Sequence, residues 1–300
     1  MITEQDVQRY LSDGFLVVPD VLSADELATL HDEVRKLCRG AYPSKVLPPV
    51  GPEVTDDEAM ADIYCIFDAH RISPVIAAYL QHERVAAVLS RLVGAHLPHW
   101  DGAVKAMQSQ VFVKPPGFQG MAWHQDEAYI PTRDRSLCAV WIALDDATED
   151  NGTMRVIPGS HRMGYLWPQR DHGRLDEFDY APEAYGFDEG AEQRVDVPAG
   201  AALFIHGYLL HRSTRNRSAR TRRVLSFHTM NAWSVLPWLH PAGMDPVSKA
   251  DVRRITMIHG RDPYAWKGVE DPGDVALRTC SVNEARLTDR WQRAFGDDLE

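Results

Sequence analysis

The sequence of 300 residues lacks what several classes of protein need. It has no apolar run long enough to span a bilayer, which takes about 20 consecutive apolar residues. Its opening, MITEQDVQRY, has neither the basic flank nor the apolar core of a secretory signal. Cysteine is scarce, and Cys38, Cys65, Cys138 and Cys280 form no CxxC pair. We therefore expect reduced thiols, a cytoplasmic location and no membrane partner.

Positive charge is also scarce relative to negative charge. Lysine and arginine number 32 against 43 aspartates and glutamates, which leaves a formal net charge of −11. Proteins that bind nucleic acid draw much of their affinity from basic side chains that neutralise phosphates, so no nucleic-acid partner is expected. The one local exception is the basic stretch RNRSARTRR at 215–223.

The first third of the chain has the pattern of helices around a short strand. Thr3 with Asp6 resembles a capping box, and Ser23 with Glu26 is a full one, so each pair predicts the start of a helix. Over residues 1–95 we expect a helix ended by Gly14, a strand at 15–21, a helix at 24–38, a loop at 41–62 and one or two helices at 72–94.

From about residue 100 the pattern changes to short strands separated by turns. The dipeptide Asn151-Gly152 predicts a hairpin. Regularly spaced strands of this kind favour a mainly β fold with helical additions, either a sandwich or a jelly roll, over a parallel α/β sheet. We predict a single domain over 1–300, in which elements at 1–95 precede a core at 100–232 with an insert at 162–193. An extension at 233–300 follows, with a helix in NEARLTDRWQRAF (283–295).

The stretch WHQDEAYIP (123–131) holds His124 and Asp126, which would share one side of a strand because alternate residues do. Two ligands hold a metal poorly, and non-haem iron oxygenases use two histidines and one carboxylate. His211, at the end of an apolar strand, is the preferred third ligand. His206 competes, but its parity is opposite unless Gly207 introduces a bulge.

Arg222, at the start of the next strand, suits a dicarboxylate co-substrate, because a guanidinium can bind a carboxylate through two nitrogens. Its charge would also balance that of iron(II), one aspartate and a dianionic 2-oxoacid. Ser213 and Asn216 lie between His211 and Arg222 in the sequence. Arg220 and Arg223 are the alternatives to Arg222.

These motifs together resemble the phytanoyl-CoA dioxygenase family of iron(II)/2-oxoglutarate oxygenases. The resemblance is strong over about 100–230, looser before residue 94, and does not cover the tail after 235. It is carried by WHQD, by the segment AVWIALDDATEDNGTMRVIPGSH (139–161) and by PAGAALFIHGYLLHRSTRNRSARTRR (198–223).

The resemblance implies a mainly β fold with a double-stranded β-helix (jelly-roll, cupin-like) core. It also implies roles for these residues. His124, Asp126 and His211 would bind iron(II), Arg222 with Ser213 would hold the tail carboxylate of 2-oxoglutarate, and Trp141 and Gln108 would line the co-substrate pocket. Related halogenases have a small residue in place of the carboxylate, so Asp126 favours hydroxylation. The implied reaction consumes O₂ and 2-oxoglutarate, releases succinate and CO₂, and hydroxylates a small organic molecule.

Alternatives remain open for the function and for single residues. A cupin-like metal enzyme that does not use 2-oxoglutarate and a non-catalytic jelly-roll binding module are the rival hypotheses. Among single residues, His228 is expected to pack in the core and His161 to be structural or at the pocket rim. Tyr129, Trp233 and Trp238 are candidates to line the substrate pocket.

Overall fold

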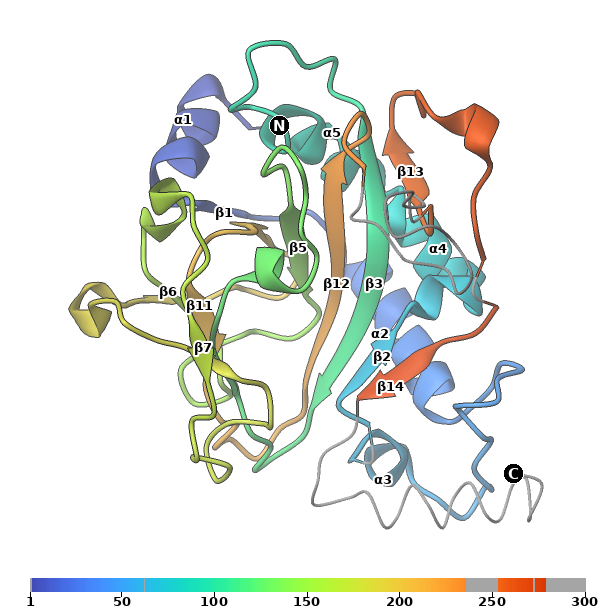
Figure 1. Ribbon diagram of the computed structural model, residues 1–300. Coiled ribbons are helices and arrows are strands. Elements are labelled where there is room, and N and C mark those ends of the chain that lie inside the picture. Colours follow the sequence, from blue (N-terminus) through green and yellow to red (C-terminus); the bar gives the residue numbers. More distant parts are fainter. Residues whose placement is uncertain (1, 62, 236–252, 272, 279–300) are drawn as a thin grey trace, which may run out of the picture.

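The large antiparallel sheet of this protein carries helices on one face and a smaller sheet on the other (Figure 1). The computed structural model describes residues 2–61, 63–235, 253–271 and 273–278. The large sheet has the order β1-β10-β5-β12-β3-β2-β14, with β13 also paired to β3, and the small sheet has the order β4-β11-β6-β9. The expected mainly β, double-stranded β-helix fold is confirmed.

The strands of the large sheet are β1 (Phe15–Val18), β2 (Cys65–Phe67), β3 (Val104–Lys114), β5 (Cys138–Ala143), β10 (Ala202–His206), β12 (Arg222–Asn231), β13 (Thr256–His259) and β14 (Ala276–Arg278). The small sheet contains β4 (Met121–His124), β6 (Met154–Val156), β9 (Gln193–Val195) and β11 (His211–Ser213). A separate pair consists of β7 (Gln169–Arg170) and β8 (Glu183–Ala184). The helices are α1 (Glu4–Asp13), α2 (Ala24–Cys38), α3 (Asp56–Ala61), α4 (Pro74–Leu80) and α5 (Glu83–Leu92).

The strand β12 shows why the two faces of the large sheet differ. Leu225 and Phe227 are fully buried in the core that the helices share with this sheet. Alternate residues point to the opposite face, where Arg222, Ser226 and His228 line a cavity. One ten-residue strand thus supplies apolar packing on one side and polar groups on the other.

Capping boxes begin the first two long helices, as the sequence predicted. The Thr3 hydroxyl accepts a hydrogen bond from the Asp6 backbone N–H, and Ser23 does the same for Glu26. In each case the acidic side chain also accepts a hydrogen bond from the backbone N–H of the cap residue, so the donors at the helix start are satisfied. Residues 72–94 form two helices, and the stretch predicted as a loop at 41–62 includes α3.

The prediction of a hairpin at Asn151-Gly152 is wrong. The backbone does turn at Gly152, which has a φ of +76°. The flanking strands β5 and β6 belong to different sheets, so the turn carries the chain across the sandwich. The Asn151 side chain stabilises it by accepting from the Thr148 N–H and donating to the Asp146 carbonyl. A dipeptide defines a local turn, whereas strand pairing depends on distant partners.

The prediction that His211 ends the strand containing His206 is also wrong. The strand β10 ends at His206, and His211 begins β11 in the other sheet. Gly207 starts the crossing, and its N–H donates to the carbonyl of Leu137. The parity argument against His206 therefore does not apply, because the two histidines do not share a strand.

Other expectations concern membrane-spanning helices, the thiols and the C-terminal residues. Within the described residues no helix is long and apolar enough to cross a membrane. Cys65 and Cys138 are buried free thiols, as expected. The helix expected at 283–295, Cys280 and Trp238 lie outside the described residues.

Candidate metal centre and cavity

Two histidines of the small sheet lie close to one aspartate of the loop that follows β4. His124 and His211 are direct cross-strand partners on β4 and β11, and their ring centroids lie 4.0 Å apart. Oδ1 of Asp126 lies 3.7 Å from Nε2 of His124 and 3.6 Å from Nε2 of His211. One ligand atom from each of the three residues lies within 4.8 Å of the other two. The arrangement could hold a metal ion.

Backbone carbonyls orient both rings. Nδ1 of His124 lies 2.7 Å from the carbonyl of Ala122, and Nδ1 of His211 lies 2.9 Å from that of Leu209. Each Nδ1 therefore carries a proton, and each Nε2 is the ring nitrogen left to bind a metal. The expectation that Asp126 lies on the same strand as His124 is wrong, because Asp126 begins the 3-10 turn Asp126–Ala128.

The protonation states suit metal binding. Burial and, to a lesser extent, the neighbouring His211 lower the pKa of His124 to about 3, so the imidazole is neutral. Burial opposes ionisation of Asp126, but His211 and His228 together hold its pKa well below the usual range. A neutral His124 imidazole and an ionised Asp126 carboxylate are ligand forms that suit the two-histidine, one-carboxylate triad, which leaves positions open on non-haem iron.

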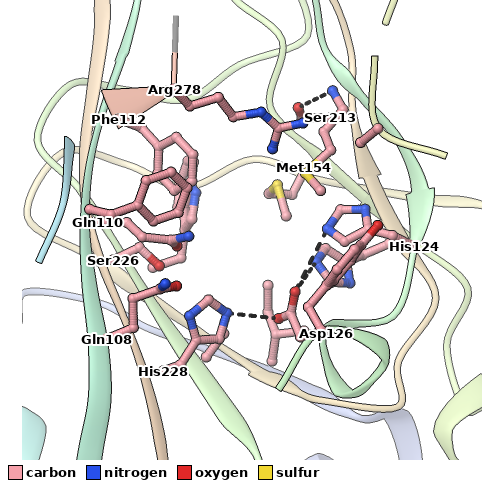
Figure 2. Close-up of a pocket in the computed structure, with 18 of the residues that line it drawn as sticks. Gln108, Gln110, Phe112, His124, Asp126, Met154, Ser213, Ser226, His228 and Arg278 are labelled. Atoms are coloured by element: carbon pink, nitrogen blue, oxygen red, sulfur yellow. Dashed lines mark hydrogen bonds and ion pairs between the residues drawn. The ribbon is translucent and has the colours of Figure 1, made fainter. Parts of the chain in front are cut away.

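A fourth residue, His228, contacts the triad from the large sheet. Its Nε2 lies 3.4 Å from Oδ2 of Asp126 (Figure 2). The expectation that His228 chiefly packs in the core overlooked this contact. Sequence parity with Arg222 was the available signal, since both residues face the cavity from β12.

The triad opens into a cavity of about 400 Å³ between the two sheets. All four predicted co-substrate residues, Gln108, Trp141, Ser213 and Arg222, line it. Figure 2 shows Gln108, Ser226 and His228 on the side of the cavity opposite His124. Apolar groups complete the wall, including those of Phe112, Met121, Ala139, Met154 and Ile205.

Arg222 is buried, and its cationic group lies 5.0 Å from the centre of the Trp141 ring. Its Nε and Nη1 have no hydrogen-bond acceptor. Burial lowers the pKa of Arg222 to about 10, which still leaves it charged at neutral pH. A buried cation with unused donors is costly unless an anion pairs with it. This residue therefore fits the tail carboxylate of a 2-oxoacid.

The two alternative arginines have other surroundings. Arg223 forms a two-point ion pair with Asp145, at 2.8 and 2.6 Å. Arg220 is exposed on the preceding loop. Neither lines the cavity, so the structure distinguishes Arg222 from its neighbours.

Two basic residues near the cavity were not predicted from the sequence. Lys114, directly opposite Arg222 on β3, is fully buried and donates to the Ser213 hydroxyl at 3.3 Å. Arg278, on β14, lines the cavity. No sequence signal pointed to Arg278, because it stands alone in the tail that the resemblance does not cover.

Some of the remaining candidate residues line the cavity and others do not. Tyr129 lines the cavity, whereas Trp233 is exposed elsewhere. His206 lies outside the cavity, where its ring is 4.9 Å from that of His161. His161 in turn lies 3.1 Å from the Leu11 carbonyl, in agreement with a structural role.

Comparisons with known proteins bear on this site. The family model described as phytanoyl-CoA dioxygenase (PhyH) matches residues 10–224. Phytanoyl-CoA dioxygenase 1 of Oryza sativa subsp. japonica is 26% identical over 266 residues, which cover 79% of this chain and 94% of the plant protein. L-proline trans-4-hydroxylase of Streptomyces griseoviridis is 27% identical over 237 residues, 72% of this chain and 82% of that protein.

The fold has solved counterparts as well. The non-heme alpha-ketoglutarate-dependent epimerase SnoN from nogalamycin biosynthesis aligns with a TM-score of 0.63 and 23% identity, over 86% of this chain and 98% of SnoN. At this identity the likeness concerns the fold. It agrees with the two-sheet arrangement that brings the triad and the cavity together.

Proposed function

We propose, since the chain belongs to the phytanoyl-CoA dioxygenase family, that it is an iron(II)/2-oxoglutarate-dependent dioxygenase that hydroxylates a small organic molecule. One observation carries the proposal: a buried arginine with unused donors, Arg222, lines the same cavity as the triad. A metal alone would explain the triad, but it would leave this cation without a partner.

His124, Asp126 and His211 would hold the iron(II) ion. The bound metal would supply the activation of O₂ and the chelation of a 2-oxoacid, which side chains cannot provide. The carbonyls of Ala122 and Leu209 fix the ring orientations, and His228 supports the aspartate. The presence of a carboxylate at Asp126, where a halide site would need a small residue, favours hydroxylation.

Arg222 would bind the tail carboxylate of 2-oxoglutarate. Trp141 presents its ring face to the guanidinium and limits where it can move. Ser213 is held by Lys114 and by the Met121 N–H, which donate to its oxygen at 3.3 and 3.1 Å. Its own hydroxyl proton is thus free for an anion. Gln108 would add a neutral contact from the opposite wall.

The co-substrate set would be close to electrically neutral. Iron(II) and the guanidinium carry three positive charges, which Asp126 and a 2-oxoglutarate dianion balance. Neutrality matters because an uncompensated charge in a buried site costs several kcal/mol. Apolar groups such as those of Phe112, Met154 and Ile205 would keep water away while one C–H bond is held near the metal.

The primary substrate is proposed to be a small molecule. A cavity of about 400 Å³ lies at the lower end of the range for ligand sites, and the co-substrate must share it. Relatives differ in what they oxidise: one is named for proline and another, from Stutzerimonas stutzeri, for hypophosphite. The family name therefore does not imply an acyl-CoA substrate.

The test is an anaerobic titration of the protein with iron(II) and 2-oxoglutarate, followed by visible absorption. The parent should develop the charge-transfer band of an iron-chelated 2-oxoacid, and on admission of O₂ it should release succinate slowly even without substrate. Arg222→Ala should lose 2-oxoglutarate affinity, whereas the exposed Arg220→Ala should not.

Two results would favour the rivals. Full 2-oxoglutarate affinity in Arg222→Ala would point to a cupin-like enzyme that does not use this co-substrate. Identical iron(II) titrations of the parent and His124→Ala would point to a non-catalytic binding module. A succinate-release screen against a panel of small molecules then identifies the substrate.

A further inference from the structure

Arg278 reaches the cavity from the edge of the large sheet, and the co-substrate proposed above does not require it. Its Nη2 lies 2.9 Å from Oδ2 of Asp179, a residue of the insert. Its Nε is buried and has no hydrogen-bond acceptor. The guanidinium therefore keeps donor capacity beyond its ion pair.

The exposed residues of the lining mark the mouth of the cavity. Tyr129 is 46% exposed and Tyr180 is 67% exposed, and both line it. Arg278 lies over the Tyr180 ring at 4.9 Å and over the Tyr64 ring at 5.8 Å. Arg222, by contrast, is 3% exposed. Arg278 is thus the arginine nearer the mouth, and Figure 2 shows it on the side of the cavity opposite Asp126.

The surroundings hold Arg278 charged and in place. Burial opposes its charge, but Asp179 raises the pKa of the guanidinium above its usual value. The two tyrosine rings restrict the movement of its plane. A molecule that enters past Tyr180 therefore meets an oriented, charged fork before it reaches the triad.

We propose that Arg278 binds a carboxylate of the primary substrate and so selects small carboxylic acids. The planar fork of an arginine matches the two oxygens of a carboxylate. Arg222 would be occupied by the co-substrate, so the second arginine remains for the molecule to be oxidised. This inference rests on the proposed function and narrows its substrate class.

The main alternative is a structural role, in which the Arg278–Asp179 pair only ties the insert to the edge of the large sheet. That role would affect all ligands alike. Recognition of a carboxylate would affect acids and spare uncharged molecules of the same shape. The preference for an acid over its carboxamide is therefore the readout that separates the two roles.

The experiment measures binding to the anaerobic protein loaded with iron(II) and saturating 2-oxoglutarate. Calorimetry compares hexanoate with hexanamide and phenylacetate with phenylacetamide, on the parent, Arg278→Gln, Arg278→Lys and Asp179→Asn. We expect the parent to prefer the acids by about tenfold, as one charge-assisted pair allows. The preference should vanish in Arg278→Gln, remain in part in Arg278→Lys, and persist in Asp179→Asn.

Several results would overturn the inference. These are equal binding of acids and amides by the parent, no binding of either acid, and an equal loss for all four probes in Arg278→Gln and Asp179→Asn. Loss of 2-oxoglutarate affinity in Arg278→Gln would instead make Arg278 the co-substrate clamp. If the parent binds iron(II) and 2-oxoglutarate normally in these experiments, only the substrate class fails and the proposed function stands.

Discussion

Nε2 of His228 and Oδ2 of Asp126 lie 3.4 Å apart, so the large sheet directly supports a carboxylate that belongs to the triad. The remaining oxygen of Asp126, Oδ1, is the one that faces His124 and His211. Oδ2 thus lies at ion-pair distance from His228, while Oδ1 lies beside the two histidines with which it could bind a metal. Partners of this kind orient metal ligands.

The first prediction concerns this contact. His228→Ala should weaken iron(II) binding about 10- to 100-fold, the usual effect of removing a residue that orients a ligand. Anaerobic equilibrium titration measures the dissociation constant. Ser226→Ala is the matched control, because Ser226 lies on the same face of β12 but donates its hydrogen bond to the Val140 carbonyl. An unchanged iron(II) affinity in His228→Ala would show that the contact does not position Asp126.

The second prediction concerns the ring against Arg222. Trp141→Leu should remove a cation–π contact worth about 0.5–2 kcal/mol, which raises the 2-oxoglutarate dissociation constant roughly 2- to 30-fold. Iron(II) affinity should not change, because the cation–π contact of Trp141 is with Arg222 and not with a residue of the triad. Trp233→Leu, at an exposed tryptophan outside the cavity lining, is the control. Equal 2-oxoglutarate affinities in the two variants would contradict the role of Trp141.

The third prediction concerns two glycines in the left-handed region. A Cβ on Gly152 (φ +76°) would lie 2.1 Å from the Thr214 carbonyl oxygen, whereas one on Gly117 (φ +78°) would meet nothing closer than 3.9 Å. Gly117→Ala should lower the free energy of unfolding by about 1–3 kcal/mol through backbone strain alone. Gly152→Ala should cost more, since the backbone must move, and should also disturb the adjacent Ser213. Urea unfolding measures the loss of stability in both variants. Equal losses would contradict the predicted clash at Gly152.

The fourth prediction concerns acid stability. Glu26 accepts hydrogen bonds from the Ser23 N–H and hydroxyl and lies 2.9 Å from His82, and these contacts lower its pKa from 4.5 to about 2. A lowered carboxyl pKa stabilises the fold fully above the unfolded pKa, near 4.5, and the stabilisation is lost as the pH falls towards 2.

Glu26→Gln keeps the shape of the capping box but cannot ionise. At neutral pH it should lower the free energy of unfolding by about 1 kcal/mol. The difference from the parent should shrink between pH 4.5 and pH 2. Urea unfolding at several pH values checks this, with the exposed Glu53→Gln as control. A difference that does not depend on pH would contradict the assignment of the stabilisation to the charge.

Local signals in the sequence were sufficient where the physics is local. The caps at Thr3 and Ser23 depend on residues a few positions apart. The turn at Gly152 was predicted for the same reason, but its connection was not. Which strand pairs with which depends on burial over the whole sheet, and this is why a predicted hairpin is a crossing between sheets.

The candidate site divides in the same way. The types and spacing of His124, Asp126, His211 and Arg222 indicated a triad and an anion partner because metal and carboxylate chemistry restrict the choice of side chain. The contribution of Arg278 could not be inferred, since nothing near it in the sequence relates it to the core. It reaches the cavity because β14 pairs with β2 at the edge of the large sheet.

The sequence by itself therefore determined the fold class and a set of side chains whose chemistry suits iron and a 2-oxoacid. Only the tertiary structure decided that His228 supports Asp126, that Arg222 rather than Arg220 or Arg223 enters the cavity, and that Arg278 stands near its mouth. The physical reason is that ligand chemistry is a property of residue types, whereas proximity between distant segments arises from sheet pairing and burial.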